Sequence, residues 1–147
     1  MDRIAQFFSF RGRVGRQEYW LMVIANWVVL FAAGTVVVTV GGLGLVVAVP
    51  LYGLAMWAAL ARLVRRLHDR GRSGWWLLLM FGPLLVLSFL GAAASVSDEE
   101  AGLFFKALTL PFSLWILIDL GCLAGRPEPN RFGPPLARPG VSAEVFD

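Results

Sequence analysis

The sequence is poor in the residues that build disulfides, metal sites and most catalytic centres. It contains one cysteine, Cys122, and one histidine, His68, among 147 residues. A lone cysteine excludes an internal disulfide, and a zinc site needs three or four ligands. A Cys122 and His68 nucleophilic pair is geometrically conceivable, but a single cysteine in an apolar helix is usually a packing residue. We therefore expect no catalytic residue, no metal and no cofactor, and a protein that is not an enzyme.

Charge is absent from two long stretches of the chain. No Asp, Glu, Lys or Arg occurs between Tyr19 and Ala61, and none occurs between Ser73 and Ser97. Hydrophobic residues make up 58% of the chain, against roughly 45–50% in soluble domains. As one helix the first stretch would be about 65 Å long, twice the roughly 30 Å of a bilayer core. It must fold back, most simply at the glycines of residues 41–44.

A third apolar stretch, residues 101–125, is interrupted by Lys106 and Asp119. With it, the sequence predicts an all-α integral membrane four-helix bundle, a single domain over residues 1–147. The spans fall at about residues 19–40, 44–62, 74–96 and 102–124. Ile4, Phe7 and Phe8 share a helical face, which predicts a short interfacial helix at the N-terminus. We expect residues 137–147 to form a flexible tail.

The arginines indicate how the helices are oriented. All twelve precede the first span, separate the second from the third, or follow the fourth. The positive-inside rule makes that side cytoplasmic, with both termini inside, whereas the opposite loop contains acidic residues 98–100. Four aromatic residues near the inner ends of the first and third spans are the expected membrane-interface anchors: Tyr19, Trp20, Trp75 and Trp76.

Two polar residues lie within the predicted spans. Asn26 and Asp119 are each about 10 Å from the inner end of their helix. We expect them in one inner-leaflet cluster that Arg62 or Arg66 can reach. The favoured interpretation is a static polar link between helices, and the alternative is an ion or proton site.

Three separated stretches carry a family resemblance: FRGRVGRQEYW at residues 10–20, RRLHDRGRSGWW at 65–76 and GRPEPNRFGPP at 125–135. Together they resemble the domain-of-unknown-function 805 family of small bacterial inner-membrane proteins, over nearly the whole chain. The resemblance implies a multi-pass protein of the bacterial inner (plasma) membrane and leaves the biochemical activity open.

All three motifs lie on the predicted cytoplasmic side. We expect them to meet in a cap of charge-assisted hydrogen bonds, with Asp69 receiving arginines from the connector or from the N-terminal motif. Asn130 would dock on the connector, residues 65–76. The role of His68 is open, because a connector requires no imidazole. The expected cap or interaction residues are Arg13, Arg16, Arg65, Arg66, His68, Asp69 and Asn130.

Five arginines within residues 62–72 suggest an acidic partner. The connector is short and tethered to the bilayer at both ends, so we expect no nucleic acid and favour anionic lipid headgroups. A second copy of the chain or another membrane protein is a further candidate partner.

The predicted function is a membrane-organising or protein/lipid interaction module with a basic cytoplasmic face. The alternative is a small oligomeric transporter or channel that uses the polar cluster around Asp119. A water-filled cavity reaching Asp119 would favour transport, whereas a fixed inner cap would favour binding.

Overall fold

The fold of the chain, seen in a computed structural model that describes residues 8–134 and 136, is all-α. Apart from Phe8, the predicted interfacial helix lies outside the described residues, and so does the predicted tail at 137–147. Three continuous helical stretches are long and apolar enough to cross a membrane: Arg16–Asp69, Trp76–Ala94 and Glu99–Cys122.

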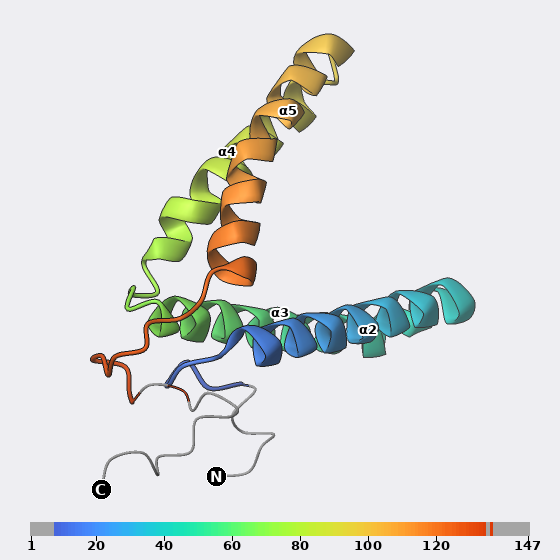
Figure 1. The fold of residues 1–147 in the computed structure, drawn as a ribbon. Helices are drawn as coiled ribbons and strands as arrows, with labels where there is room; N and C mark the ends of the chain where they lie inside the picture. Colours follow the sequence, from blue (N-terminus) through green and yellow to red (C-terminus); the bar gives the residue numbers. More distant parts are fainter. Residues whose placement is uncertain (1–7, 135, 137–147) are drawn as a thin grey trace, which may run out of the picture.

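The first of these stretches folds back on itself. Helix α2 (Arg16–Val40) leads into the short turn η1 (Gly41–Leu43), and α3 (Gly44–Asp69) returns beside α2 (Figure 1). Gly41 has a φ of 71°, which glycine adopts without strain. A Cβ on Gly44 would lie 2.7 Å from the carbonyl oxygen of Val36, so glycine also permits the close approach of the two backbones. The chain therefore turns where the glycines predict.

A second hairpin follows. Helix α4 (Trp76–Ala94) packs along α5 (Glu99–Ile116), and the chain continues into the π-helical segment η2 (Leu117–Cys122). Asp98 caps α5, because its Oδ1 accepts hydrogen bonds from the backbone N–H groups of Glu100 at 2.9 Å and Ala101 at 3.3 Å. Close to this turn, a Cβ on Gly102 would lie 2.5 Å from the Cβ of Ser95, so small residues bring α4 and α5 together.

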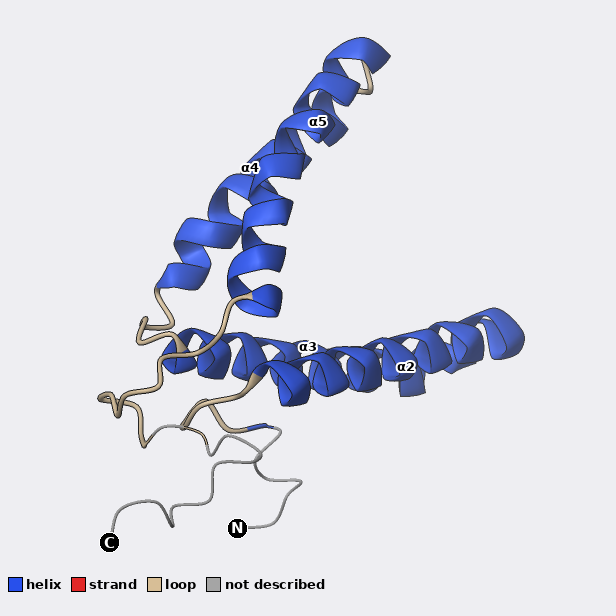
Figure 2. Ribbon diagram, viewed as in Figure 1, coloured by secondary structure: helices blue, strands red, loops and turns tan. Residues whose placement is uncertain are grey.

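The two hairpins diverge from a common end (Figures 1 and 2). Between them, contacts link η2 to α2 and α3, and α3 to α4. The structure thus shows two hairpins joined at one end and does not show the predicted four-helix bundle. The outward faces are apolar, with Phe31 79% and Phe89 74% exposed. In lipid such faces gain little by packing against each other, so the polar end must hold the hairpins together.

The buried core lies at this common end. Its apolar part comprises Val14, Tyr19, Leu67, Met80 and Leu120. Several charged side chains are buried in the same region, and Arg66 is the largest fully buried side chain of the described residues. The end that contains the three sequence motifs is therefore the packed part of the molecule.

Candidate functional site

The centre of the packed end is Asp69, the last residue of α3. Gly71 has a φ of 74° and ends the helix, with backbone hydrogen bonds from Gly71 to His68 and from Arg72 to Leu67, both 2.9 Å. These two bonds form a Schellman motif. Asp69 is only 2% exposed, so its carboxylate requires charged or hydrogen-bonding partners.

Two arginines supply those partners. Arg13 Nε donates to Oδ1 of Asp69 at 3.0 Å, and an Nη1 hydrogen of Arg66 is donated to Oδ2 at 2.7 Å. Arg66 lies one helical turn before Asp69, whereas Arg13 comes from the segment that precedes α2. We call Arg13, Arg66 and Asp69 the Asp69 cap.

Every nitrogen of the Arg66 guanidinium has a partner. Besides Asp69, it donates to the carbonyl oxygens of Leu120 at 2.7 Å, Leu123 at 2.5 Å and Val14 at 3.2 Å. A charge with no solvent exposure is tolerated only when it is paired and fully hydrogen-bonded. Arg66 therefore ties α3 both to the segment before α2 and to the end of η2.

Arg13 links the same regions from the other side. Its Nη1 donates to the carbonyl of Glu128 at 2.9 Å, and its Nη2 donates to the carbonyl of Arg126. The backbone N–H of Arg126 in turn donates to the carbonyl of Asp69 at 2.9 Å. A Cβ on Gly125 would lie 1.9 Å from Oδ2 of Asp69, so this position has room only for glycine.

The carbonyls at the end of η2 form a row of acceptors. The last carbonyls of a helix have no partner within it, and the dipole makes that end negative. Here every carbonyl from residue 120 to residue 124 accepts a hydrogen bond from a side chain. The donors are Arg16, Trp20, Arg66 and Arg70. The predicted cap residue Arg16 thus binds the helix end, at Cys122 O, and not Asp69.

Asp119 is held in a second ion-pair cluster. Its Oδ1 lies 3.1 Å from Arg70 Nη2, and its Oδ2 lies 2.9 Å from Arg72 Nη1. Both arginines follow the end of α3, where the turn brings them back over η2. The predicted cluster of Asp119 with Asn26 and with Arg62 or Arg66 is therefore not formed, because nearer arginines occupy Asp119 and Arg66 pairs with Asp69.

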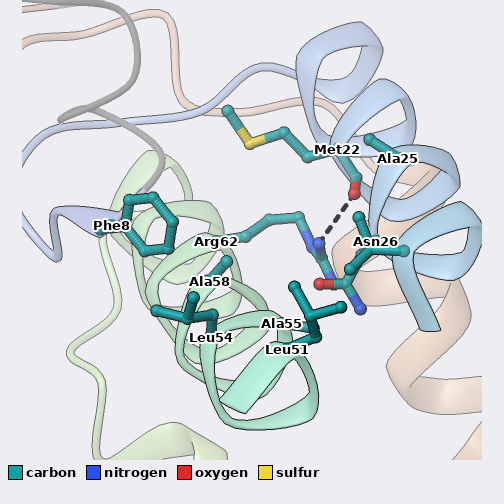
Figure 3. A pocket seen from close by; sticks show the side chains of 10 residues that line it. Phe8, Met22, Ala25, Asn26, Leu51, Leu54, Ala55, Ala58 and Arg62 are labelled. Atoms are coloured by element: carbon teal, nitrogen blue, oxygen red, sulfur yellow. Dashed lines mark hydrogen bonds between the residues drawn. The ribbon is translucent and has the colours of Figure 1, made fainter. Parts of the chain in front are cut away.

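Asn26 instead lines a cavity between α2 and α3, together with Arg62 (Figure 3). Arg62 Nη1 donates to the carbonyl of Met22 at 3.0 Å, and Arg65 Nη2 lies 3.5 Å from the Met22 sulfur. Arg65, expected in the cap, thus lies outside it on the α2 side. Sequence reasoning missed Met22 as a partner, and a thioether carries no charge that could have revealed it.

His68 joins the two terminal motifs to α3. Its ring stacks on Phe132 with the centroids 3.8 Å apart and the planes at 5°, and Nδ1 lies 3.3 Å from the carbonyl oxygen of Gly12. Asn130 donates from Nδ2 to the carbonyl of His68 at 2.9 Å. The structure therefore gives the imidazole two tasks, a flat face for Phe132 and a nitrogen for Gly12.

The predicted interface aromatics occupy four different surroundings. Trp75 is 78% exposed, as a side chain in contact with headgroups would be, but Tyr19 belongs to the buried core. Trp20 donates from Nε1 to the carbonyl of Gly121 at 3.1 Å. Arg72 lies over the ring of Trp76, 4.5 Å from its centroid.

These features define a class of protein: an all-α, multi-pass integral membrane protein whose hairpins are joined at one end by buried Arg66, which donates to η2, and by the ion pairs of Arg70 and Arg72 with Asp119. The chain belongs to the family described as "Protein of unknown function (DUF805)", whose family model matches residues 7–134.

Relatives in Escherichia coli strain K12 agree with this assignment. Uncharacterized protein YiiR is 35% identical over 131 residues, which cover 86% of this chain and 84% of YiiR. Inner membrane protein YhaH is 31% identical over 140 residues, 89% of each chain. Inner membrane protein YhaI is 40% identical over 83 residues, 56% of this chain and 70% of YhaI. No solved structure matches the chain. The protein is an inner-membrane, multi-pass protein of unknown function.

The Asp69 cap predicts coupling between Arg13 and Asp69. We expect Asp69→Ala and Arg13→Ala each to lower the free energy of unfolding by about 3 kcal/mol. Asp69→Ala leaves two buried arginines without their carboxylate, and Arg13→Ala leaves the buried Asp69 with only one of its two arginines. The double variant should lose less than the sum, since both changes remove the same ion pair. Denaturation of the purified protein in detergent measures these values. Arg11→Ala, an exposed change in the same segment, is the control, and full additivity would contradict direct coupling.

The stack of His68 on Phe132 predicts protection of the following segment. His68→Ala should raise the rate of trypsin cleavage after Arg131 about fivefold, because a lost aromatic stack of about 1 kcal/mol opens the segment more often. His68→Phe keeps a flat ring and should cleave nearly as slowly as the wild type. Equal cleavage rates for the wild type and His68→Ala would show that the stack does not hold the segment.

Proposed function

We propose that this chain is a non-enzymatic, membrane-organising module that binds anionic lipid headgroups with its cytoplasmic face. In this proposal the hairpins cross the inner membrane four times, and the Asp69 cap and both termini are cytoplasmic. Two features support that orientation: the described arginines gather at the common end of the hairpins, and residues 98–100 at the tip of the second hairpin are acidic.

The observation that carries the proposal is that the arginines fall into two groups, one buried or paired within the protein and one exposed. Those of the connector are buried or paired within the protein, as Arg66 with Asp69 and Arg70 and Arg72 with Asp119 show. The Asp69 cap is therefore a fixed structure, and most of the connector arginines are already paired within the protein. Four other arginines around the same end are exposed: Arg11, Arg16, Arg126 and Arg131.

These exposed arginines suit a lipid surface. Each basic residue close to an anionic leaflet contributes about 1 kcal/mol of attraction. The exposed acids of the same region, Glu18 and Glu128, are fewer than the exposed arginines, so the face stays basic. The lipid contact expected from sequence is thus reassigned from the connector to the segment that leads into the first residue of α2, Arg16, and to the segment after η2.

Transport through Asp119 has less support. Both oxygens of its carboxylate are bound by arginines, and the residue is 3% exposed. The cavity beside Arg62 is not lined by Asp119. A proton or ion site needs a carboxylate that can exchange partners along a path. An enzymatic role has less support again, because His68 contacts Gly12, Phe132 and Asn130 instead of a nucleophile.

The proposed lipid contact predicts a preference for anionic lipid. We expect brominated phosphatidylglycerol to quench the native tryptophans more strongly than brominated phosphatidylcholine when the protein is reconstituted in mixed vesicles. Changing Arg11, Arg16, Arg126 and Arg131 to glutamine should remove most of this preference. About 1 M salt should also remove most of the preference, because it shortens the Debye length to about 3 Å and screens the arginines from the lipid.

The control replaces the same four arginines by lysine, which preserves the charge and should preserve the preference. If the glutamine variant kept the full preference for phosphatidylglycerol, the exposed arginines would not be the lipid contact and the proposal would fail.

A further inference from the structure

A cavity of about 290 Å³ lies between α2 and α3, with Arg62 in its wall (Figure 3). Most of its lining is apolar and comes from both helices, including Ala25 and Val29 on α2 and Leu54 and Ala58 on α3. Val29 and Leu54 are exposed, so the cavity opens between the helices toward the surrounding lipid. It is therefore a crevice that a long apolar group can enter from the side.

The charge in this crevice is not balanced. Arg62 is 7% exposed, and one of its nitrogens donates to the carbonyl of Met22. Its Nε is buried with no hydrogen-bond partner among the described residues. Within the same described part of the chain no carboxylate forms an ion pair with Arg62 or with its buried neighbour Arg65. A buried guanidinium in this condition is costly unless an anion reaches it.

The depth of Arg62 suits a lipid. It lies seven residues before Asp69, so it is about 10 Å along α3 from the cap. With the cap in the cytoplasm, this places the guanidinium near the boundary of headgroups and acyl chains. A charged group at that level meets phosphates on one side and hydrocarbon on the other.

We propose that the crevice binds one anionic phospholipid, with the phosphate on Arg62 and part of one acyl chain between α2 and α3. The volume of about 290 Å³ is just below the roughly 300–1,000 Å³ of ligand pockets, which suits an occupant that enters only in part. Small side chains keep the space open, among them Ala25, Ala55 and Ala58. The charge and the apolar lining together match an acidic amphiphile. A free anion would leave the apolar lining uncovered, and a neutral chain would leave the charge of Arg62 unpaired.

This inference deepens the proposed lipid role but uses different residues. The exposed arginines would contact exchanging lipids at the surface, whereas the crevice would retain one lipid per chain. Phe8 also lines the crevice, and its carbonyl accepts a hydrogen bond from Trp57 Nε1 at 3.2 Å, which holds Phe8 beside α3.

The test is native mass spectrometry of the full chain, purified in detergent and exchanged into phosphatidylglycerol or phosphatidylcholine with identical acyl chains. We expect one retained phosphatidylglycerol per chain and little retained phosphatidylcholine. Ala58→Leu, which fills the crevice and leaves the charge unchanged, should abolish retention. Arg62→Gln should lower the preference for phosphatidylglycerol about fivefold. Ala32→Leu, an exposed change on α2 outside the crevice, should retain lipid like the wild type.

Equal retention of the two lipids by the wild type would overturn the inference, and this comparison does not depend on any variant folding. Unchanged retention by a folded Ala58→Leu protein would overturn it as well. The four-glutamine surface variant separates the two proposals, because it should keep the retained lipid. If it keeps the retained lipid but also keeps its quenching preference, the surface proposal fails and the crevice stands.

Discussion

The carboxylate of Asp69 bonds at once to Arg13, from the segment before α2, and to Arg66, one turn back in its own helix. Its backbone carbonyl accepts from the N–H of Arg126, beyond η2. Three parts of the chain that are distant in sequence thus meet at one buried residue: the carboxylate of Asp69 binds Arg13 and Arg66, and its backbone carbonyl binds Arg126. A buried charge without partners is far more costly than a paired one. Moving any one of these segments would therefore break a bond that Asp69 makes and destabilise the other two.

This constraint accounts for the shape of the molecule. The outward surfaces of the hairpins are as apolar as lipid tails, so they gain little by packing against one another, and the hairpins diverge away from the cap. The same constraint assigns the arginines. Arg66, Arg70 and Arg72 hold the ends of helices, and Arg62 faces the crevice between α2 and α3. The exposed arginines beside the cap are accessible to a partner, and Arg16 among them also donates to the carbonyl of Cys122.

Much of the fold could be predicted from the sequence, because charge-free runs and the glycines of residues 41–44 determine where helices lie and turn. The second span was placed at about residues 44–62, and α3 continues beyond it to Asp69, where Arg62, Arg65 and Arg66 find partners inside the protein. The sequence predicted that Asp69 receives arginines from the connector or from the N-terminal motif, and the structure shows one from each, Arg66 and Arg13. The partners of Asp119 were missed because they depend on how the turn after α3 folds back. The role of the carbonyls of residues 120–124 as hydrogen-bond acceptors was not predicted, because every residue has a backbone carbonyl and the sequence does not distinguish those that bind arginines.

The central claim is that one buried residue, Asp69, holds three segments together, and hydrogen–deuterium exchange of Asp69→Asn beside the wild type in detergent tests it most directly. The account predicts that peptides covering residues 12–15, 66–72 and 120–130 lose protection together, while the turn at residues 95–100 exchanges as in the wild type. Loss of protection confined to residues 66–72, with the other two segments unchanged, would contradict it.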